Sequence, residues 1–600
     1  MELVNQKELD KLITLVGTNN ISCLVSPTGS GKSTIVPVEF VKNNAIVYCV
    51  QPTRNSVCSL YYYVKQKYKN VKVGYILSDD NKSNHIDKCN LVYCSPSYMK
   101  NFLIKNFNNK DIKFNILMLD EIHIGKIEYD IIVSLWINMC KRFQVPRLVL
   151  SSAVLNLNYI PVDLSDKILE IKKKSTTETI YHDKFFSIKE QNNLFKDLKQ
   201  KILEYHSTHK VKDYSTWIVF LNGKYEINSF IKYFGENKSI NLISNLKLEE
   251  KDYLIKGVRT IIVTTNVYES SSTLKYVDGI FDSMLEKISI ISPTGNKKLL
   301  TKNISKSSAI QRAGRTGRDR KGFVYRMCTE DFYKTLSNFN ISELNRTNLS
   351  ILFLELFTRK IDPIELFSFR LDDERISQFI NELENLNLIK DNKIVSIETT
   401  NFIFKHREFG LNQIMIMKEW LDKSLPLFPL IVLFSFINTN TYIFKNSNQS
   451  LVDIYLDLWD KFSQEVKSIN PSKQKLTKWC NENNLNFYGF EQLLKNIKEI
   501  YEGLREYYKI DIGRFDTGNF VKNITSIIST QNIIIFNNLK DSNLYSNSYG
   551  EMFSLQEKPK GFSVNKSKKH EKIAVFRTFS PIDAENRHTG KNYIKLYLPL

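Results

Sequence analysis

A glycine-rich stretch near the N-terminus has the residue types and the order of a loop that binds nucleotide phosphates. It follows the apolar run 21–25 and precedes a run, 35–42, that is typical of a helix. Its residues are Ser26, Pro27, Thr28, Gly29, Ser30, Gly31, Lys32, Ser33 and Thr34. Small residues let backbone N–H groups turn inward around the β- and γ-phosphates, and the following helix directs its positive end at the same anion. We therefore predict that Lys32 reaches the β- and γ-phosphate oxygens of a nucleotide and that the Ser33 hydroxyl binds Mg²⁺.

An acidic pair after a second apolar run could supply the remaining hydrolytic groups. Asp120, Glu121, Ile122 and His123 follow the run 116–119. A carboxylate at the end of a buried strand can hold the water shell of Mg²⁺, and its neighbour can polarise the attacking water. We assign the first role to Asp120 and the second to Glu121, and we expect His123 to relay the nucleotide state between domains. Acidic pairs also cap helices, so the assignment depends on the phosphate loop that precedes it.

An arginine-rich segment, residues 311–318, reads QRAGRTGR. One interpretation is a solvated basic helix face, since arginines three residues apart lie together on a helix. Two glycines argue against a plain helix, because each weakens it by about 1 kcal/mol. The alternative is an arginine finger, which neutralises charge on the transferred phosphoryl group. The segment falls in a second α/β domain, so it would reach the nucleotide only when two domains close.

The apolar runs predict two sheets that position these groups. The first series is 21–25, 45–50, 91–94, 116–120 and 147–152, and the second is 217–221, 241–244, 259–265 and 279–282. Continuous β-branched runs separated by helix-length stretches are typical of parallel sheets covered on both faces. We expect a Lys-rich linker near 160–180. Beyond residue 340 the sequence predicts long helices at 345–360, 372–390, 411–437, 451–469 and 485–508, and then a small β-barrel in 520–600.

Taken together, the motifs resemble those of superfamily 2 helicases of the DExH/DEAH group, which includes the DEAH-box RNA helicases and the poxvirus nucleoside-triphosphatase RNA helicase. Further matching segments are Gln51-Pro52-Thr53-Arg54, Tyr93-Cys94-Ser95-Pro96-Ser97, Ser152-Ala153-Val154, 220–227 (FLNGKYEI) and 264–271 (TTNVYESS). The resemblance implies two RecA-like domains followed by winged-helix, helical-bundle (ratchet-like) and OB-like domains. The expected boundaries are 1–165, 166–338, 339–400, 401–515 and 516–600.

The resemblance also implies roles for single residues. Gln311 would position the attacking water, and Arg315 and Arg318 would touch the γ-phosphate. Ser152 and Ala153 would couple hydrolysis to the second domain. The residues that would contact the sugar–phosphate backbone are Arg54, Ser95, Gly223 and Thr264. Two positions depart from the family pattern: Ser26 replaces a Gly or Ala, and Val154 lacks the hydroxyl that links the hydrolytic strand to the second domain.

Residues 286–302 read independently as a β-hairpin, because apolar residues alternate on both sides of a Pro-Thr-Gly-Asn turn. Their place resembles that of the strand-separating hairpin of DEAH-type helicases, although an ordinary sheet-extending hairpin explains the pattern equally well. Segments 345–349 and 479–483 resemble parts of the winged-helix and helical-bundle domains. A lysine cluster in the tail could touch RNA, although a solvated loop explains it better; its members are Lys558, Lys560, Lys566, Lys568 and Lys569.

The composition limits the classes of protein to which this chain can belong. The chain has 600 residues with 84 Lys+Arg against 64 Asp+Glu, a net charge of +20, and such an excess favours a polyanionic partner. The eight cysteines form no CxxC pair, which indicates free thiols in a reducing compartment. The longest apolar run, 425–437, is too short to span a bilayer, and residues 1–16 do not read as a targeting signal. We expect a soluble cytoplasmic monomer, or a virion-associated one if the source is viral, with no membrane partner.

The sequence therefore predicts an ATP-dependent RNA helicase, that is, a nucleic-acid-stimulated NTPase with ATP and Mg²⁺ as cofactors. Its partners would be single-stranded RNA and RNA duplexes with overhangs. RNA is implied by the resemblance alone, so a DNA helicase or translocase remains an alternative. The second alternative is a nucleic-acid-binding scaffold with a decayed motor, that is, one that no longer hydrolyses ATP. Base selectivity, polarity and protein partners stay open.

Overall fold

The computed structural model describes most of the first 440 residues and shorter parts of the remainder. The described residues are 5–27, 30–77, 86–154, 164–171, 177–211, 213–244, 253–269, 274–291, 297–317, 320–439, 452–466, 471–510, 517–531, 535–538, 544–546, 552–555, 572–579 and 592–599. Arg318, Thr28, Gly29 and the tail lysine cluster lie outside them. Two compact units make up the chain: residues 1–290, 298–347 and 356–377 form one, and the remaining residues form the other.

The first sheet has seven strands in the order β3-β4-β2-β5-β6-β1-β7, and every pairing is parallel. This confirms the predicted α/β class. The strands are β1 (Ile21–Val25), β2 (Val47–Val50), β3 (Val73–Ile76), β4 (Leu91–Cys94), β5 (Ile116–Leu119), β6 (Arg147–Ser152) and β7 (Ile168–Glu170). The two that were not predicted, β3 and β7, form the two edges of the sheet, where short and half-exposed strands lack a continuous apolar run.

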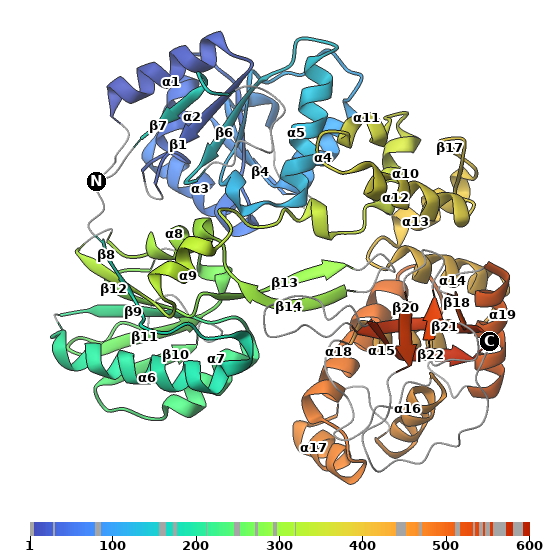
Figure 1. Ribbon diagram of the computed structural model, residues 1–600. Coiled ribbons are helices and arrows are strands. Elements are labelled where there is room, and N and C mark those ends of the chain that lie inside the picture. Colours follow the sequence, from blue (N-terminus) through green and yellow to red (C-terminus); the bar gives the residue numbers. More distant parts are fainter. Residues whose placement is uncertain are drawn as a thin grey trace. The chain divides into compact units, whose positions relative to one another are not determined.

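Helices cover both faces of this sheet (Figure 1). Apolar residues of α1 (Gln6–Thr18), α2 (Ile35–Lys42) and α3 (Arg54–Lys67) share one core with alternate strand residues such as Val47 and Cys49. On the other side α4 (Pro96–Lys105) packs beside α5 (Ile127–Cys140). Such two-sided burial explains why the strands read as unbroken apolar runs.

The second sheet has six strands in the order β10-β11-β9-β12-β15-β8, again all parallel. The strands are β8 (Thr177–Tyr181), β9 (Ser215–Phe220), β10 (Ile240–Ser244), β11 (Arg259–Thr264), β12 (Val277–Asp282) and β15 (Gly322–Arg326). Strand β8 occupies the end of the segment predicted as a linker, so the prediction was wrong there; its sequence, TETIY, contains no continuous apolar run. Trp217 and Val219 face α6 (Gln191–Thr208) and α7 (Lys224–Phe234), whereas Ile218 and Phe220 face the side of α8 (Lys306–Ala313).

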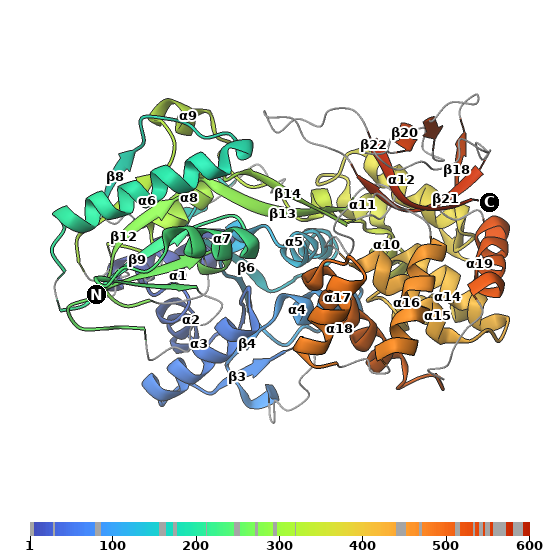
Figure 2. The same cartoon turned by 90° about the horizontal axis from the view of Figure 1, so that it is seen from below.

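The predicted hairpin is present. Strands β13 (Leu285–Ile291) and β14 (Lys297–Asn303) form a separate two-stranded sheet, and Figure 2 shows them as two long strands side by side. Its turn, residues 292–296, lies outside the described residues. At its base Lys287 Nζ pairs with Glu226 Oε1 at 2.7 Å, so the hairpin is tied to the start of α7.

Helices dominate the chain after residue 340, as predicted. They are α10 (Ser350–Thr358), α11 (Pro363–Phe367), α12 (Asp373–Asn385), α13 (Ile397–Lys405), α14 (Leu411–Asp422), α15 (Leu427–Asn438), α16 (Val452–Val466), α17 (Lys473–Glu482), α18 (Phe487–Leu504) and α19 (Thr517–Gln531). The single helix expected at 411–437 is two, because Ser424 adopts a left-handed φ of 54° and Pro426 caps α15. Strands β16 (Ile389–Lys390) and β17 (Lys393–Ile394) form a small hairpin between α12 and α13.

The final segment contains a closed barrel, as expected, with strands in the order β18-β19-β20-β22-β21. They are β18 (Ile535–Asn538), β19 (Leu544–Ser546), β20 (Met552–Leu555), β21 (Lys572–Phe579) and β22 (Asn592–Pro599). The winged-helix, ratchet-like and OB-like labels and the domain boundaries stay predictions. Among the helices of the described ranges, none combines the length and apolarity that a membrane crossing requires.

Candidate nucleotide-binding and hydrolysis site

The phosphate loop leaves β1 and turns back on itself before α2. The Ser26 backbone N–H donates to the Ser152 carbonyl at 2.9 Å, which ties the loop to β6. The hydroxyls of Ser26 and Ser30, both buried, lie 2.8 Å apart. The residue that departs from the family pattern therefore has a partner for its hydroxyl within the loop. Gly31 has a φ of 99°, and a Cβ there would lie 2.6 Å from Ile35 Cδ1, so the turn requires glycine.

Lys32 is almost fully buried, and its ammonium points at the acidic pair. Lys32 Nζ lies 3.1 Å from Glu121 Oε1 and 3.4 Å from the Ser26 carbonyl oxygen. The hydroxyl of the next residue, Ser33, hydrogen-bonds to Asp120. The loop thus brings together the cation, the hydroxyl and both carboxylates that the sequence assigned to one site.

Asp120 is completely buried at the end of β5. Burial is the main cause that raises the pKa of its carboxyl, and the nearby Glu121 raises it further, while Lys32 and hydrogen bonds from Ser33 and Gln51 act in the opposite direction. Gln51 Nε2 donates to Asp120 Oδ2 at 3.0 Å. A buried carboxylate beside a serine hydroxyl fits Mg²⁺, which usually keeps several waters and takes few protein ligands.

Among the described residues, no group of three or more His, Cys, Asp and Glu could hold a metal ion by itself. Glu121 has a left-handed φ of 54°. A non-glycine residue in that region is uncommon, and such strain clusters at functional sites. Here it turns the Glu121 side chain back toward Lys32.

His123 contacts three other residues of the site. Its Nδ1 lies 2.8 Å from Ser152 Oγ, and its Nε2 lies 3.3 Å from Glu121 Oε2. Its ring also hydrogen-bonds to the side chain of Gln311, which belongs to α8 beside the second sheet. Burial is the main cause that lowers the pKa of His123 to about 3, and the positive charges of Lys32 and Arg315 lower it further. His123 is therefore neutral at physiological pH.

The β6 segment carries the other coupling residues. The Ser152 hydroxyl donates to the Val154 carbonyl oxygen and also lies within reach of His123. The Ala153 N–H lies 3.4 Å from His123 Nδ1. Val154 lacks the family hydroxyl, but its backbone keeps a bond to Ser152.

The arginine segment is partly helix and partly turn. Helix α8 ends at Ala313, and Gly317 has a φ of 72°; the plain helical face considered for residues 311–318 is therefore wrong. Arg315 is mostly buried and donates to the Glu269 carbonyl oxygen. Its electrostatic effect on His123 places it near the site.

Arg312 was not assigned a role from the sequence, although it lies in the same motif. It is fully buried, with Nε 2.7 Å from Glu269 Oε1 and Nη1 2.7 Å from Asp282 Oδ1. Burial raises the pKa of Glu269 to about 7 despite this partner. Arg312 therefore holds the motif in place within the second sheet. Its two partners are far away in sequence, so spacing gives no signal for the network.

The residues predicted to contact the nucleic-acid backbone follow the carboxyl ends of their strands. Arg54 is exposed and begins α3, whereas Ser95 is buried and its hydroxyl caps α4 by accepting from the Tyr98 N–H. Thr264 is buried at the end of β11. Gly223 precedes α7, and a Cβ there would lie 2.5 Å from Glu226 Oε2, so a larger residue would displace the carboxylate that pairs with Lys287.

The segment after the second sheet was not predicted to contact the hydrolytic loop, but it does. The Glu343 N–H donates to the Gly125 carbonyl at 3.1 Å. Nearby, Arg370 Nη1 lies 2.8 Å from Asp130 Oδ1, and both groups are largely buried. Three residues beyond Glu343, Arg346 Nη1 donates to the Ser289 carbonyl of hairpin strand β13 at 2.6 Å. Residues 342–346 thus contact both the DExH loop and the hairpin.

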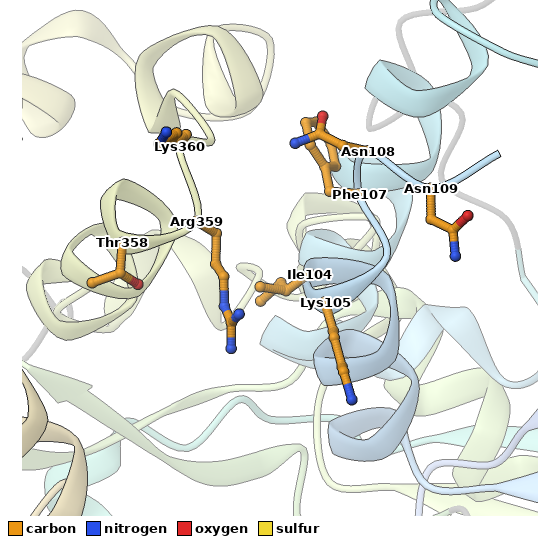
Figure 3. Close-up of a pocket in the computed structure, with 8 residues that line it drawn as sticks. All are labelled: Ile104, Lys105, Phe107, Asn108, Asn109, Thr358, Arg359 and Lys360. Carbon is orange, nitrogen blue, oxygen red and sulfur yellow. The ribbon is translucent and has the colours of Figure 1, made fainter.

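A separate pocket of about 570 Å³ lies where α4 and α10 end. It is lined by Ile104, Lys105, Phe107, Asn108, Asn109, Thr358, Arg359 and Lys360. Figure 3 shows Lys105 and Arg359 directing their charged ends to the same side. Because α4 starts at the carboxyl end of β4, its last turn lies at the opposite edge of the sheet from the phosphate loop. The cations complement the negative ends of two helices, and the pocket is not part of the nucleotide site.

Residues 6–160, which contain the phosphate loop and the DExH loop, match the family model of the DEAD/DEAH box helicases. This segment therefore resembles the DEAD/DEAH box helicases. A Schizosaccharomyces pombe relative named as a pre-mRNA-splicing ATP-dependent RNA helicase is 23% identical over 539 residues, covering 81% of this chain and 79% of the relative. The ATP-dependent RNA helicase HrpA of Borreliella burgdorferi is 24% identical over 558 residues, covering 86% of this chain and 66% of that protein.

Among solved structures, the DExH-box NTPase HrpB of E. coli matches this chain with a TM-score of 0.63. The match covers 100% of this chain and 68% of HrpB at 15% identity. At that identity it shows the fold alone, and it agrees with the two RecA-like parallel-sheet domains seen here.

Proposed function

We propose that this protein is an ATP-dependent RNA helicase that uses ATP hydrolysis to move along RNA and to unwind it. The relatives named as ATP-dependent RNA helicases support the activity. The observation that carries the proposal is the convergence at His123. Its ring hydrogen-bonds to Gln311 and responds to the charge of Arg315, while the same ring contacts Glu121. Groups of both RecA-like domains therefore meet at His123, which supports a hydrolytic centre shared by the two domains.

The chemistry follows from the contacts. Lys32 now pairs with Glu121 at 3.1 Å; when its ammonium turns to the β- and γ-phosphates of ATP, the Glu121 carboxylate becomes available to take a proton from the attacking water. Gln311 would orient that water. Arg315, and Arg318 by its place in the motif, would stabilise charge on the departing γ-phosphoryl group. Ser33 and Asp120 would hold Mg²⁺, which neutralises charge on the phosphate oxygens.

RNA as the substrate rests on the relatives and on charge. The net charge of +20 suits a partner whose phosphates bind Lys and Arg with release of counterions. Strand β13 of the hairpin is held by Glu226 at Lys287 and by Arg346 at Ser289, which would let the hairpin act as a fixed wedge against a duplex.

The test is phosphate release by the full chain with no nucleic acid, with single-stranded RNA and with single-stranded DNA, followed by unwinding of duplexes that carry an overhang on either strand. The proposal requires stimulation by RNA and ATP-dependent unwinding. Equal stimulation of ATP hydrolysis by RNA and DNA would favour the DNA helicase or translocase. If the chain hydrolyses no ATP under any condition, the remaining alternative is the nucleic-acid-binding scaffold.

A further inference from the structure

The outer surface of α3 combines exposed aromatic rings with lysines. Tyr62 and Tyr63 are 63% and 46% exposed, unusual values for large aromatic side chains. Residues 54–78 carry five Lys or Arg side chains and no Asp or Glu. The helix lies next to edge strand β3 at the margin of the first domain (Figure 2).

Neighbouring contacts hold this surface in place. Tyr61 packs against Tyr75 of β3 with ring centroids 4.8 Å apart, and it contacts Tyr62 edge-on at 5.0 Å. Lys65 Nζ donates to the Tyr61 hydroxyl at 2.8 Å. The Tyr62 ring is thus supported by its neighbour Tyr61 while most of its surface faces solvent, and the Lys65 ammonium lies at the Tyr61 hydroxyl.

The same helix begins at a predicted RNA contact. Arg54 is the first residue of α3 and follows the carboxyl end of β2. Lys65 is eleven residues further on, which is about three helical turns, so both cations lie on one face about 16 Å apart along the axis. Tyr62 lies one turn before Lys65. An RNA strand held at Arg54 could follow this face outward.

We propose that α3 is an accessory site for single-stranded RNA, in which Tyr62 stacks on a base and Lys65 binds a neighbouring phosphate. The inference rests on the proposed function, because it extends the RNA path expected at Arg54. Aromatic platforms flanked by cations are the usual means of binding single strands without sequence preference. Protein–protein interfaces, in contrast, are depleted of lysine, so a protein partner fits this surface less well.

The test is fluorescence anisotropy of the full chain with fluorescein-labelled oligouridines of 8 and 20 nucleotides. Loss of one stacked base lowers affinity by about five- to 150-fold, so Tyr62→Ala should weaken binding of the 20-mer by that range and of the 8-mer much less. Tyr62→Phe keeps the ring and should restore binding. Lys65→Gln should instead reduce the dependence of log affinity on log salt by about 0.7.

Tyr233→Ala is the matched control. Tyr233 is 48% exposed and has Lys199 5.3 Å from its ring centroid, yet it lies on α7 away from this surface. Thermal melting checks that each variant is folded. The inference is overturned if Tyr62→Ala binds the 20-mer within twofold of the unmodified protein, or no more weakly than Tyr233→Ala. If the unmodified chain binds neither oligonucleotide, the proposed function itself fails.

Discussion

The buried ring of His123 should stay neutral well below physiological pH, and lowering the pH tests this directly. In the unfolded chain a histidine has a pKa of about 6.5, whereas burial lowers the pKa of His123 to about 3 in the fold. Between these values the unfolded chain binds a proton that the fold does not. His123 therefore contributes stability above pH 6.5 that is lost as the pH falls toward 3.

The size of the effect follows from the two pKa values. Between pH 7 and pH 5, proton binding by the unfolded chain favours opening at His123 by about 25-fold, or roughly 2 kcal/mol. Hydrogen exchange of the peptide that covers β5 and the DExH loop, corrected for the intrinsic rate at each pH, measures this opening. His123→Gln removes the titrating group, so the variant should lack this part of the pH dependence.

Other groups also titrate between pH 7 and pH 5. Because they contribute equally to the unmodified chain and to the His123→Gln variant, the difference between the two pH dependences isolates the contribution of His123. Histidine NMR of the unmodified chain offers a second readout, since the His123 ring should show no protonation down to pH 4. A ring that titrates near pH 6.5, or an identical pH dependence in the His123→Gln variant, would refute the argument that the ring is buried among positive charges.

Three further predictions concern the phosphate loop, the arginine network and the hairpin. Lys32→Ala should weaken ATP binding at least tenfold in a fluorescent-nucleotide titration, because it removes the buried cation that meets the phosphates; affinity equal to that of the exposed control Lys42→Ala would discredit the loop. Arg312→Leu leaves the Glu269 and Asp282 carboxylates buried without their partner, which should cost about 3–5 kcal/mol in denaturant unfolding, and a loss below 1 kcal/mol would contradict the network. Arg346→Ala removes the bond that holds Ser289 of hairpin strand β13, so the amount of duplex unwound per ATP hydrolysed should fall several-fold. An unchanged amount per ATP would show that unwinding does not depend on this bond.

The sequence predicted the two parallel sheets because strands buried on both faces leave continuous apolar runs. It did not predict β8, whose alternating residues Thr177–Tyr181 carry no such run at the edge of a sheet. The prediction of one helix over 411–437 missed the turn at Ser424. There the backbone adopts a left-handed conformation, which ends the helix within an otherwise helical pattern.

The residues of the candidate site also fall into those that the sequence predicted and those that it did not. Lys32, Asp120 and Glu121 belong to short motifs, so the sequence alone could assign them to one site, and the fold brings them together. The contacts of Arg312 and of Glu343 join residues more than 20 positions apart. Only the folded chain brings such pairs together, and one sequence offers no pattern that reveals them.

The central claim is that two RecA-like domains each supply part of one hydrolytic centre. RNA-stimulated ATP hydrolysis measured side by side for Glu121→Gln and Arg315→Ala tests it most directly, because each variant removes a group from a different domain. Both variants should bind ATP, and both should hydrolyse it at least a hundredfold more slowly than the unmodified protein. Turnover by Arg315→Ala at the unmodified rate, while Glu121→Gln is inactive, would contradict the shared site.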